Sequence, residues 1–368
     1  MTDRHRFRAK VVALLLAAAL VTLAIACGAP QPFGTGGGTN EAGAVRLQGA
    51  GATFPMPLYQ KWVSEYGKAH PDVKIDYQSI GSGGGIKQIT ERTVDFGASD
   101  KPMSDDELKA APGELLHIPT VLGAVVVTYN LPGNPELKFS PDVVADIFLG
   151  NIKRWDDPRI KADNAGANLP AADIAVVHRS DGSGTSAVFT DYLSKVSPEW
   201  KQKVGTGTSP SWPTGQGGKG NEGVTGMVRQ QPNSIGYVEL VYAEQTKLPV
   251  ALVKNASGNF VKPSLDSVTA AASEALASTP EDLRVSITNS GGASAYPISS
   301  YTYILVYKDQ KDASKGKALV DFLWWAVHDG EQYAKDLSYA PLPQQVVSRV
   351  EAKLNSITSG GKPLRSAQ

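Results

Sequence analysis

The chain has 368 residues, and its 36 lysines and arginines balance 36 aspartates and glutamates, so the formal net charge is zero. This balance gives no long-range attraction toward nucleic acid or an anionic membrane surface, and we expect no nucleic-acid partner. The length is sufficient for two domains of ordinary size.

The N-terminus has the pattern of a signal peptide, predicted over residues 1–26. Basic residues between positions 4 and 10 precede an unbroken apolar run from Val11 to Ala26. This run is shorter than the roughly 20 residues that a membrane-spanning helix needs. A Gly/Pro-rich segment follows it in place of a stop-transfer charge cluster, so a permanent span is not expected.

Cys27 directly follows the apolar run and is the only cysteine in the chain. It cannot form an internal disulfide. Its position predicts a lipoprotein whose processed N-terminal cysteine carries a lipid such as palmitate, although Ala24 stands where such signals usually have leucine. The alternative is an incidental thiol in an ordinary secretory signal. Residues 27–44 are then a lipidated cysteine and a flexible tether that holds the protein at the outer face of the cell membrane.

Strand-like and helix-like segments alternate through the rest of the chain, which predicts an α/β fold with mainly parallel sheets. In the first part we expect strands near Val45 and over 73–77 and 94–99, helices over 55–69 and 86–92, and a capping box at 104–107. The apolar run 121–127 predicts a strand buried on both faces. Further on we expect a helix capped by Ser140, a strand over 174–177, a helix after Thr185, a loop over 205–223, a strand over 301–307 and helices over 315–327 and 344–356.

Three short segments share one plan, a turn of small or hydroxyl-bearing residues that follows a strand and opens a helix. They lie at residues 49–55, 81–87 and 181–186. A helix N-terminus has unpaired N–H groups and favours an anion, while glycines allow close approach and hydroxyls add neutral donors. Arg179, just before the third segment, would add a positively charged guanidinium group that can make two parallel hydrogen bonds. The pattern indicates an oxyanion site, with ordinary helix caps as the alternative.

Several segments, in order from about residue 45 to the C-terminus, resemble one known family. They are GAGATFP at 49–55, IGSGGGIKQI at 80–89, VDFGASDKPMSDDEL at 94–108, IFLGNIKRWDDPRI at 147–160, IAVVHRSDGSGTS at 174–186, WPTGQGGKGNEGV at 212–224 and SIGYVEL at 234–240. The family is the phosphate-binding component of the bacterial phosphate-specific ABC transporter. The resemblance implies a receptor that captures inorganic phosphate outside the cytoplasm, without catalysis, metal or cofactor, and delivers it to an importer of two permeases and two ATPases.

The resemblance also implies a type II periplasmic-binding-protein fold with two α/β lobes, a hinge and a ligand cleft between the lobes. Lobe 1 would comprise residues 45–119 and 297–368, and lobe 2 residues 120–296. The implied phosphate-binding residues are Thr53, the amide of Phe54, Ser82, Asp100, Arg179, Ser183, Gly184 and Thr185. Asp181 matches the carboxylate that pairs with the arginine and orients it.

Asp100 is unexpected in an anion pocket, because a carboxylate repels an anion. The arrangement is favourable if the ligand brings a proton, since an ionised carboxylate only accepts hydrogen bonds and phosphate near neutral pH still has an O–H to donate. Sulfate has no such proton, so Asp100 would select phosphate over sulfate.

Other motifs do not predict a function. The G-x-G-x-x-G spacing at 215–220 has no preceding strand, no ATPase phosphate loop occurs, and the five histidines lack metal-ligand spacing. His178, Asp181 and Ser183 lie within one strand-turn and lack the elbow motif of a hydrolase. Two alternatives stay open: a secreted phosphatase that uses the same pocket, and a surface adhesion or sensing protein that retains the fold without transport.

Overall fold

The computed structural model describes residues 43–365. The predicted signal peptide, Cys27 and nearly all of the tether lie outside these residues. Among the described helices none is long and apolar enough to cross a membrane.

The fold is built on a mixed eight-stranded sheet with the strand order β2-β1-β3-β11-β4-β8-β6-β7. Its strands are β1 (Val45–Gly51), β2 (Val73–Ser79), β3 (Phe96–Ser99), β4 (Leu115–Asn130), β6 (Ala175–Arg179), β7 (Gln216–Gly218), β8 (Ser234–Glu239) and β11 (Ser299–Tyr307). Both outer parts of the sheet are parallel, as predicted. The middle is antiparallel, because β11 and β4 run against each other and against their other neighbours.

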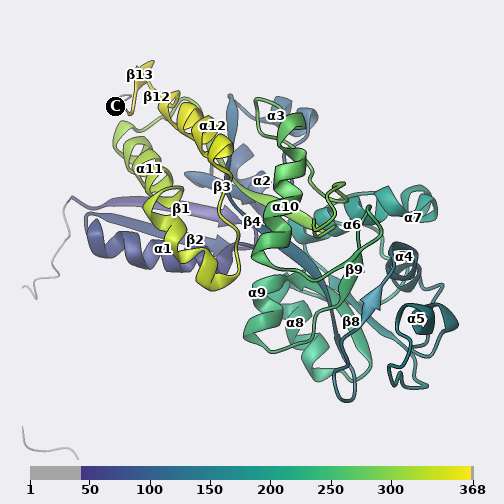
Figure 1. Ribbon diagram of the computed structural model, residues 1–368. Coiled ribbons are helices and arrows are strands. Elements are labelled where there is room, and N and C mark those ends of the chain that lie inside the picture. Colours follow the sequence, from purple (N-terminus) through teal and green to yellow (C-terminus); the bar gives the residue numbers. More distant parts are fainter. Residues whose placement is uncertain (1–42, 366–368) are drawn as a thin grey trace, which may run out of the picture. The chain divides into compact units, whose positions relative to one another are not determined.

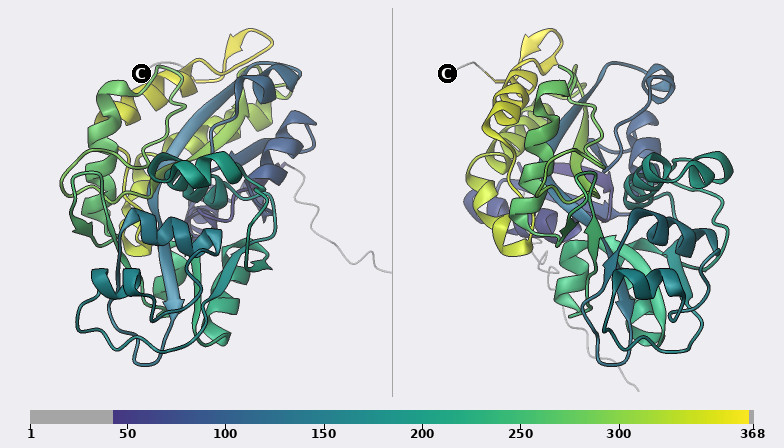
Figure 2. Two further views of the ribbon diagram at one scale, coloured as in Figure 1. Left: turned by 90° about the vertical axis from the view of Figure 1, so that its right-hand side faces the viewer. Right: turned by 45° about the vertical axis from the view of Figure 1, so that its right-hand side comes forward.

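The two lobes share the long strand β4, which runs from one to the other (Figure 1). It pairs with β11 through Leu115–Ala124 and with β8 through Val125–Asn130. Figure 2 shows this strand from two further sides. Every residue of β4 but the last is buried, which confirms the expected strand with two buried faces. Strand β4 changes its partner from β11 to β8 after Ala124 without a break. The division between the two lobes at residue 119 stays a prediction.

Helices cover both parts of the sheet. They are α1 (Met56–Ala69), α2 (Ser82–Thr90), α3 (Asp105–Ala110), α4 (Pro141–Leu149), α5 (Pro158–Asp163), α6 (Gly184–Val196), α7 (Pro198–Lys203), α8 (Gly220–Gln230), α9 (Leu240–Gln245), α10 (Leu265–Ala275), α11 (Ala313–Ala326) and α12 (Gln344–Asn355). Short 3-10 helices are η1 (Leu276–Ser278), η2 (Asp329–Tyr333) and η3 (Lys335–Leu337). The small strands β5 (Lys138–Phe139), β9 (Leu252–Lys254) and β10 (Phe260–Val261) form a second sheet, and β12 (Thr358–Ser359) and β13 (Lys362–Pro363) form a hairpin.

The two helix starts that were predicted from a serine cap differ in their capping. The predicted capping box before α3 is present, since Ser104 Oγ accepts from Glu107 N at 3.2 Å and Glu107 Oε2 accepts from Ser104 N at 2.6 Å. Pro141 occupies the first position of α4, as expected. Ser140 has the extended backbone of a cap, but its side chain makes no capping hydrogen bond.

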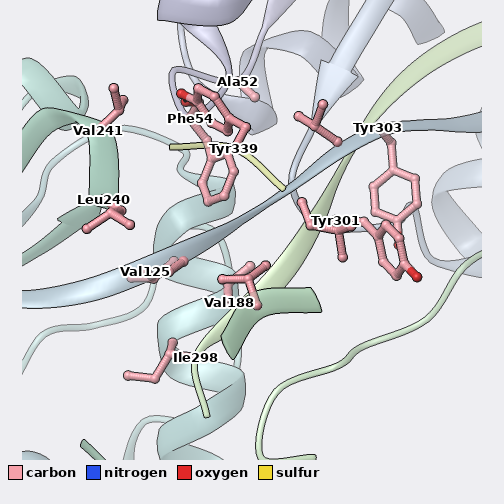
Figure 3. Packing of buried hydrophobic residues seen from close by; sticks show 14 of the residues in the cluster. Ala52, Phe54, Val125, Val188, Leu240, Val241, Ile298, Tyr301, Tyr303 and Tyr339 are labelled. Carbon is pink, nitrogen blue, oxygen red and sulfur yellow. The ribbon is translucent and has the colours of Figure 1, made fainter. Parts of the chain in front are cut away.

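Buried side chains fill the region where β4 passes between the lobes (Figure 3). Phe54 and Tyr339 lie beside each other there, with ring centroids 6.2 Å apart. The Tyr339 hydroxyl donates to the Phe54 carbonyl at 2.6 Å. The turn before α1 is therefore held by a residue from the C-terminal part of the chain.

Two predicted boundaries were wrong. Helix α2 begins at Ser82 and includes the glycines that were expected to precede it. A Cβ on Gly85 would lie 2.4 Å from the Ala98 carbonyl, so this glycine allows the helix to pack closely on the sheet. The expected loop over 205–223 contains β7 and the start of α8, because residues 216–218 extend the sheet beside β6.

Candidate functional site

The candidate site lies at the carboxyl ends of parallel strands, where open α/β sheets commonly bind ligands. Helix α1 begins there directly after the first of the three predicted turn segments, and α2 and α6 begin within the second and third. A fourth helix, α8, begins after β7. Contacts between the turns bring these N-termini together: Gly83 N donates to the Gly182 carbonyl at 2.9 Å, and Gly220 N donates to Asp181 Oδ1 at 3.0 Å. Four positive helix ends therefore surround one site.

Arg179 ends β6 and carries the only positive side chain among the predicted site residues. Its guanidinium forms a bidentate salt bridge with Asp181, in which Nε donates to Oδ1 at 2.8 Å and Nη2 donates to Oδ2 at 2.5 Å. Its Nη1 donates to Thr185 Oγ1 at 3.2 Å. The arginine side chain is 1% exposed. Partial burial alone would raise the pKa of Asp181, but the hydrogen bonds and charge of Arg179 lower it below the usual range.

Asp100 follows β3 and is buried among hydroxyl groups. Its Oδ1 accepts from Thr302 Oγ1 at 2.8 Å, while its Oδ2 lies 3.4 Å from Ser82 Oγ. Burial raises the pKa of Asp100 to about 7, against the lowering effects of the Thr302 hydroxyl and the charge of Arg179. The carboxylate is thus a hydrogen-bond acceptor in a region that otherwise presents donors.

The remaining predicted residues are buried in the same place. Thr53 is 3% exposed, and Ser82, Ser183 and Thr185 are fully buried. Ser183 Oγ caps α6 by accepting from Ser186 N at 3.0 Å, which leaves its O–H as a donor. The cap and the anion-site interpretations of this serine are therefore compatible.

Gly184 is a point of close approach between the two lobes at the site. A Cβ there would lie 2.3 Å from Ser82 Oγ and 2.6 Å from Asp100 Oδ2. These distances show that α6 of one lobe and the turns of the other are in direct contact. Phe54 lies in the turn two residues before α1, and its ring is buried.

Comparison with known proteins places the chain in a family. Residues 37–329 match the family model described as PBP superfamily domain. The chain is also 48% identical over 322 residues to the phosphate-binding protein PstS of Pasteurella multocida, an alignment that covers 86% of this chain and 93% of that protein. The chain belongs to the PstS phosphate-binding proteins.

Solved structures share the PstS fold at lower identity. A phosphate-binding protein from Stenotrophomonas maltophilia aligns with a TM-score of 0.64 and 21% identity, covering 84% of this chain and 94% of that one. An ABC-type phosphate transport receptor from Vibrio cholerae aligns with a TM-score of 0.55 and 18% identity, covering 81% of this chain and 100% of that one. These likenesses support the two-lobe periplasmic-binding-protein architecture.

The structure of this PstS family member also places two residues at the site that sequence reasoning did not identify. Thr302, on β11, donates a hydrogen bond from Oγ1 to Asp100 Oδ1, although 202 positions separate the two residues. Asn221, the second residue of α8, donates to Thr53 Oγ1 at 2.8 Å across 168 positions. Only the glycine-rich segment before Asn221 was a local signal, because it is a fourth turn that opens a helix. The sequence around Thr302 has no comparable local signal.

Proposed function

We propose that this protein binds inorganic phosphate between its two lobes and delivers it to an ABC importer, without catalysing a reaction. The name shared by its relatives supports the ligand, and the name of the V. cholerae neighbour supports the transport role. The observation that carries the proposal is Asp100, a buried acceptor carboxylate among hydroxyl donors. Such a site suits an oxyanion that still carries a proton.

The charges around the site argue for recognition by hydrogen bonds. Asp181 already compensates the charge of Arg179, and an ionised Asp100 adds a negative charge. The net charge of the site therefore contributes little to the binding of an anion. Binding depends on hydrogen bonds from helix N-termini and hydroxyl groups. Phosphate can satisfy both kinds of group, because it accepts from the donors and its O–H donates to Asp100.

The contacts that we propose for phosphate come from both lobes. Lobe 1 provides Thr53, the amide of Phe54, Ser82 and Asp100, and lobe 2 provides Arg179, Ser183, Gly184 and Thr185. The proposed lobes are residues 45–119 with 297–368, and 120–296, with the hinge at the two crossings. Phosphate that bridges both sets stabilises the closed form, which the importer's permeases then recognise.

Replacing Gly184 by alanine is expected to lower the affinity for phosphate by about ten- to a hundredfold. The new methyl group would collide with Ser82 and Asp100 when the lobes meet, and such overpacking costs about 1–3 kcal/mol. Isothermal titration calorimetry measures the change. Gly226→Ala on α8 is the matched control, since a Cβ there meets nothing within 4 Å and helices favour alanine. Equal affinities for Gly184→Ala and the control would contradict the proposed closure.

For cellular location, we propose that residues 1–26 direct export and that Cys27 carries the lipid that tethers the protein to the cell membrane. The support is the sequence pattern, in which a basic segment and a short apolar run end at the single cysteine. Mass spectrometry of the protein isolated from membranes tests this part, and an unmodified Cys27 would contradict it.

To test the identity of the ligand, the protein is titrated with phosphate, sulfate and arsenate. Binding is measured by tryptophan fluorescence and by calorimetry. Trp212 is a suitable reporter, because it stacks on Tyr237, whose hydroxyl accepts from Arg179 N at 3.1 Å. Saturable binding of phosphate with rejection of sulfate is expected. No heat and no fluorescence change with phosphate would overturn the proposal, and turnover of an aryl phosphate would favour the phosphatase alternative.

A further inference from the structure

Asn221 is a fully buried amide whose orientation is determined by its neighbours. Its Oδ1 accepts from Glu239 N at 3.0 Å. A backbone N–H can only donate, so the oxygen of the amide must face Glu239 and the nitrogen must face the opposite way. The Nδ2 group then lies 2.8 Å from Thr53 Oγ1 and 3.2 Å from Thr185 Oγ1.

This amide determines which way the two threonine hydroxyls can donate. Nδ2 has two hydrogens, one for each threonine oxygen. Thr53 Oγ1 lies also within 3.3 Å of Asn221 N, and Thr185 Oγ1 accepts from Arg179 Nη1 at 3.2 Å. Both oxygens therefore act as acceptors toward protein groups. The single hydrogen of each hydroxyl is left to donate elsewhere.

The neighbouring backbone places the amide at this point. Gly220 has a φ of +71°, a conformation that favours glycine, and its N–H donates to Asp181 Oδ1. Asn221 thus follows directly after the residue that ties α8 to the Arg179–Asp181 pair. Its side chain also joins the lobes, because Thr53 precedes α1 and Thr185 lies on α6.

We propose that Asn221 is a positioning residue for anion binding. It holds the hydroxyls of Thr53 and Thr185 as donors toward the bound oxyanion and links the two lobes in the closed form. This inference rests on the proposed function, since it concerns the same site. It assigns to the start of α8 a role that the predicted contact residues do not include.

The test compares phosphate affinities of purified variants by calorimetry. Asn221→Ala is expected to bind about ten- to a hundredfold more weakly, because the hydroxyls lose the donor that orients them. Asn221→Asp keeps the shape but accepts hydrogen bonds from both hydroxyls and adds a negative charge, so its loss should be larger. This second variant keeps the test decisive if alanine prevents folding.

A double-mutant cycle separates positioning from general structural support. In a Thr53→Val, Thr185→Val background the effect of Asn221→Ala should shrink to a few-fold, because the hydroxyls through which it acts are gone. Thr225→Val is the matched control. Its buried hydroxyl donates to the Asn221 carbonyl at 2.7 Å on the same helix, and its loss should leave affinity within about twofold.

The outcomes distinguish the two proposals. If the wild-type protein does not bind phosphate, the proposed function fails. If the wild type binds but Asn221→Asp binds equally well, or if the cycle is additive, the role of Asn221 is overturned while the function stands.

Discussion

Replacing Arg179 by methionine is expected to lower the affinity for phosphate by about 10² to 10³. The side chain is buried, and truncating one partner of a buried, hydrogen-bonded charge pair at a binding site costs about 2–5 kcal/mol of binding free energy. Here the loss removes the charged fork and leaves Asp181 without its partner. Arg179→Lys should retain part of the affinity, since it keeps the charge but not the planar fork. Calorimetric titration with phosphate gives both values.

Arg159 provides a matched control for this substitution. It makes the same kind of fork with an aspartate two positions away, since Nε and Nη2 contact Asp157 at 3.0 Å each. Its side chain is 47% exposed and does not approach the site. Arg159→Met should leave phosphate affinity unchanged. A loss for Arg159→Met as large as that for Arg179→Met would mean that stability, and not the site, is responsible.

Replacing Asp100 by asparagine is expected to remove most of the discrimination between phosphate and sulfate. In the wild type, sulfate leaves the buried carboxylate unpaired and facing a like charge, and such a mismatch can reject an analogue by about 10⁴ to 10⁵. When the asparagine oxygen accepts from Thr302 Oγ1, the NH2 group takes the place of Oδ2. The amide can then donate to sulfate, while phosphate loses the acceptor for its O–H. Competition titration measures the ratio. Equal selectivity in the variant and the wild type would defeat this account.

The control for Asp100 lies at the other end of the same strand. Asp95 directly precedes β3 and pairs with Lys315 at 3.0 Å, so Asp95→Asn removes a carboxylate away from the site. Its selectivity should match that of the wild type.

The same Asp100 variant should also change how stability depends on pH. The pKa of this carboxyl is 3.8 in the unfolded chain, and burial raises it to about 7 in the folded protein. The folded state therefore holds an extra proton at pH values between these two pKa values. Wild-type stability should therefore fall, relative to Asp100→Asn, as pH rises from about 4 to about 7, by up to about 4 kcal/mol. Chemical unfolding of the ligand-free protein at several pH values measures this difference.

Local pattern predicted most elements because their signals lie within a few residues. The apolar run at 121–127 indicated a buried strand, and the Ser104 box indicated a helix start; both are present. The start of α2 was missed because glycine has low helix propensity, whereas close packing of Gly85 on the sheet decides the outcome. The strand β7 was missed because only its pairing with β6 makes it a strand.

For the site, local sequence patterns predicted three turns that suit an oxyanion and open helices, and the family resemblance singled out Asp100. The tertiary structure decided which groups complete the site. Thr302 and Asn221 reach Asp100 and Thr53 across 202 and 168 positions. Contacts so distant in the chain depend on how the lobes and sheet bring residues together, and neither periodicity nor motif spacing contains that information.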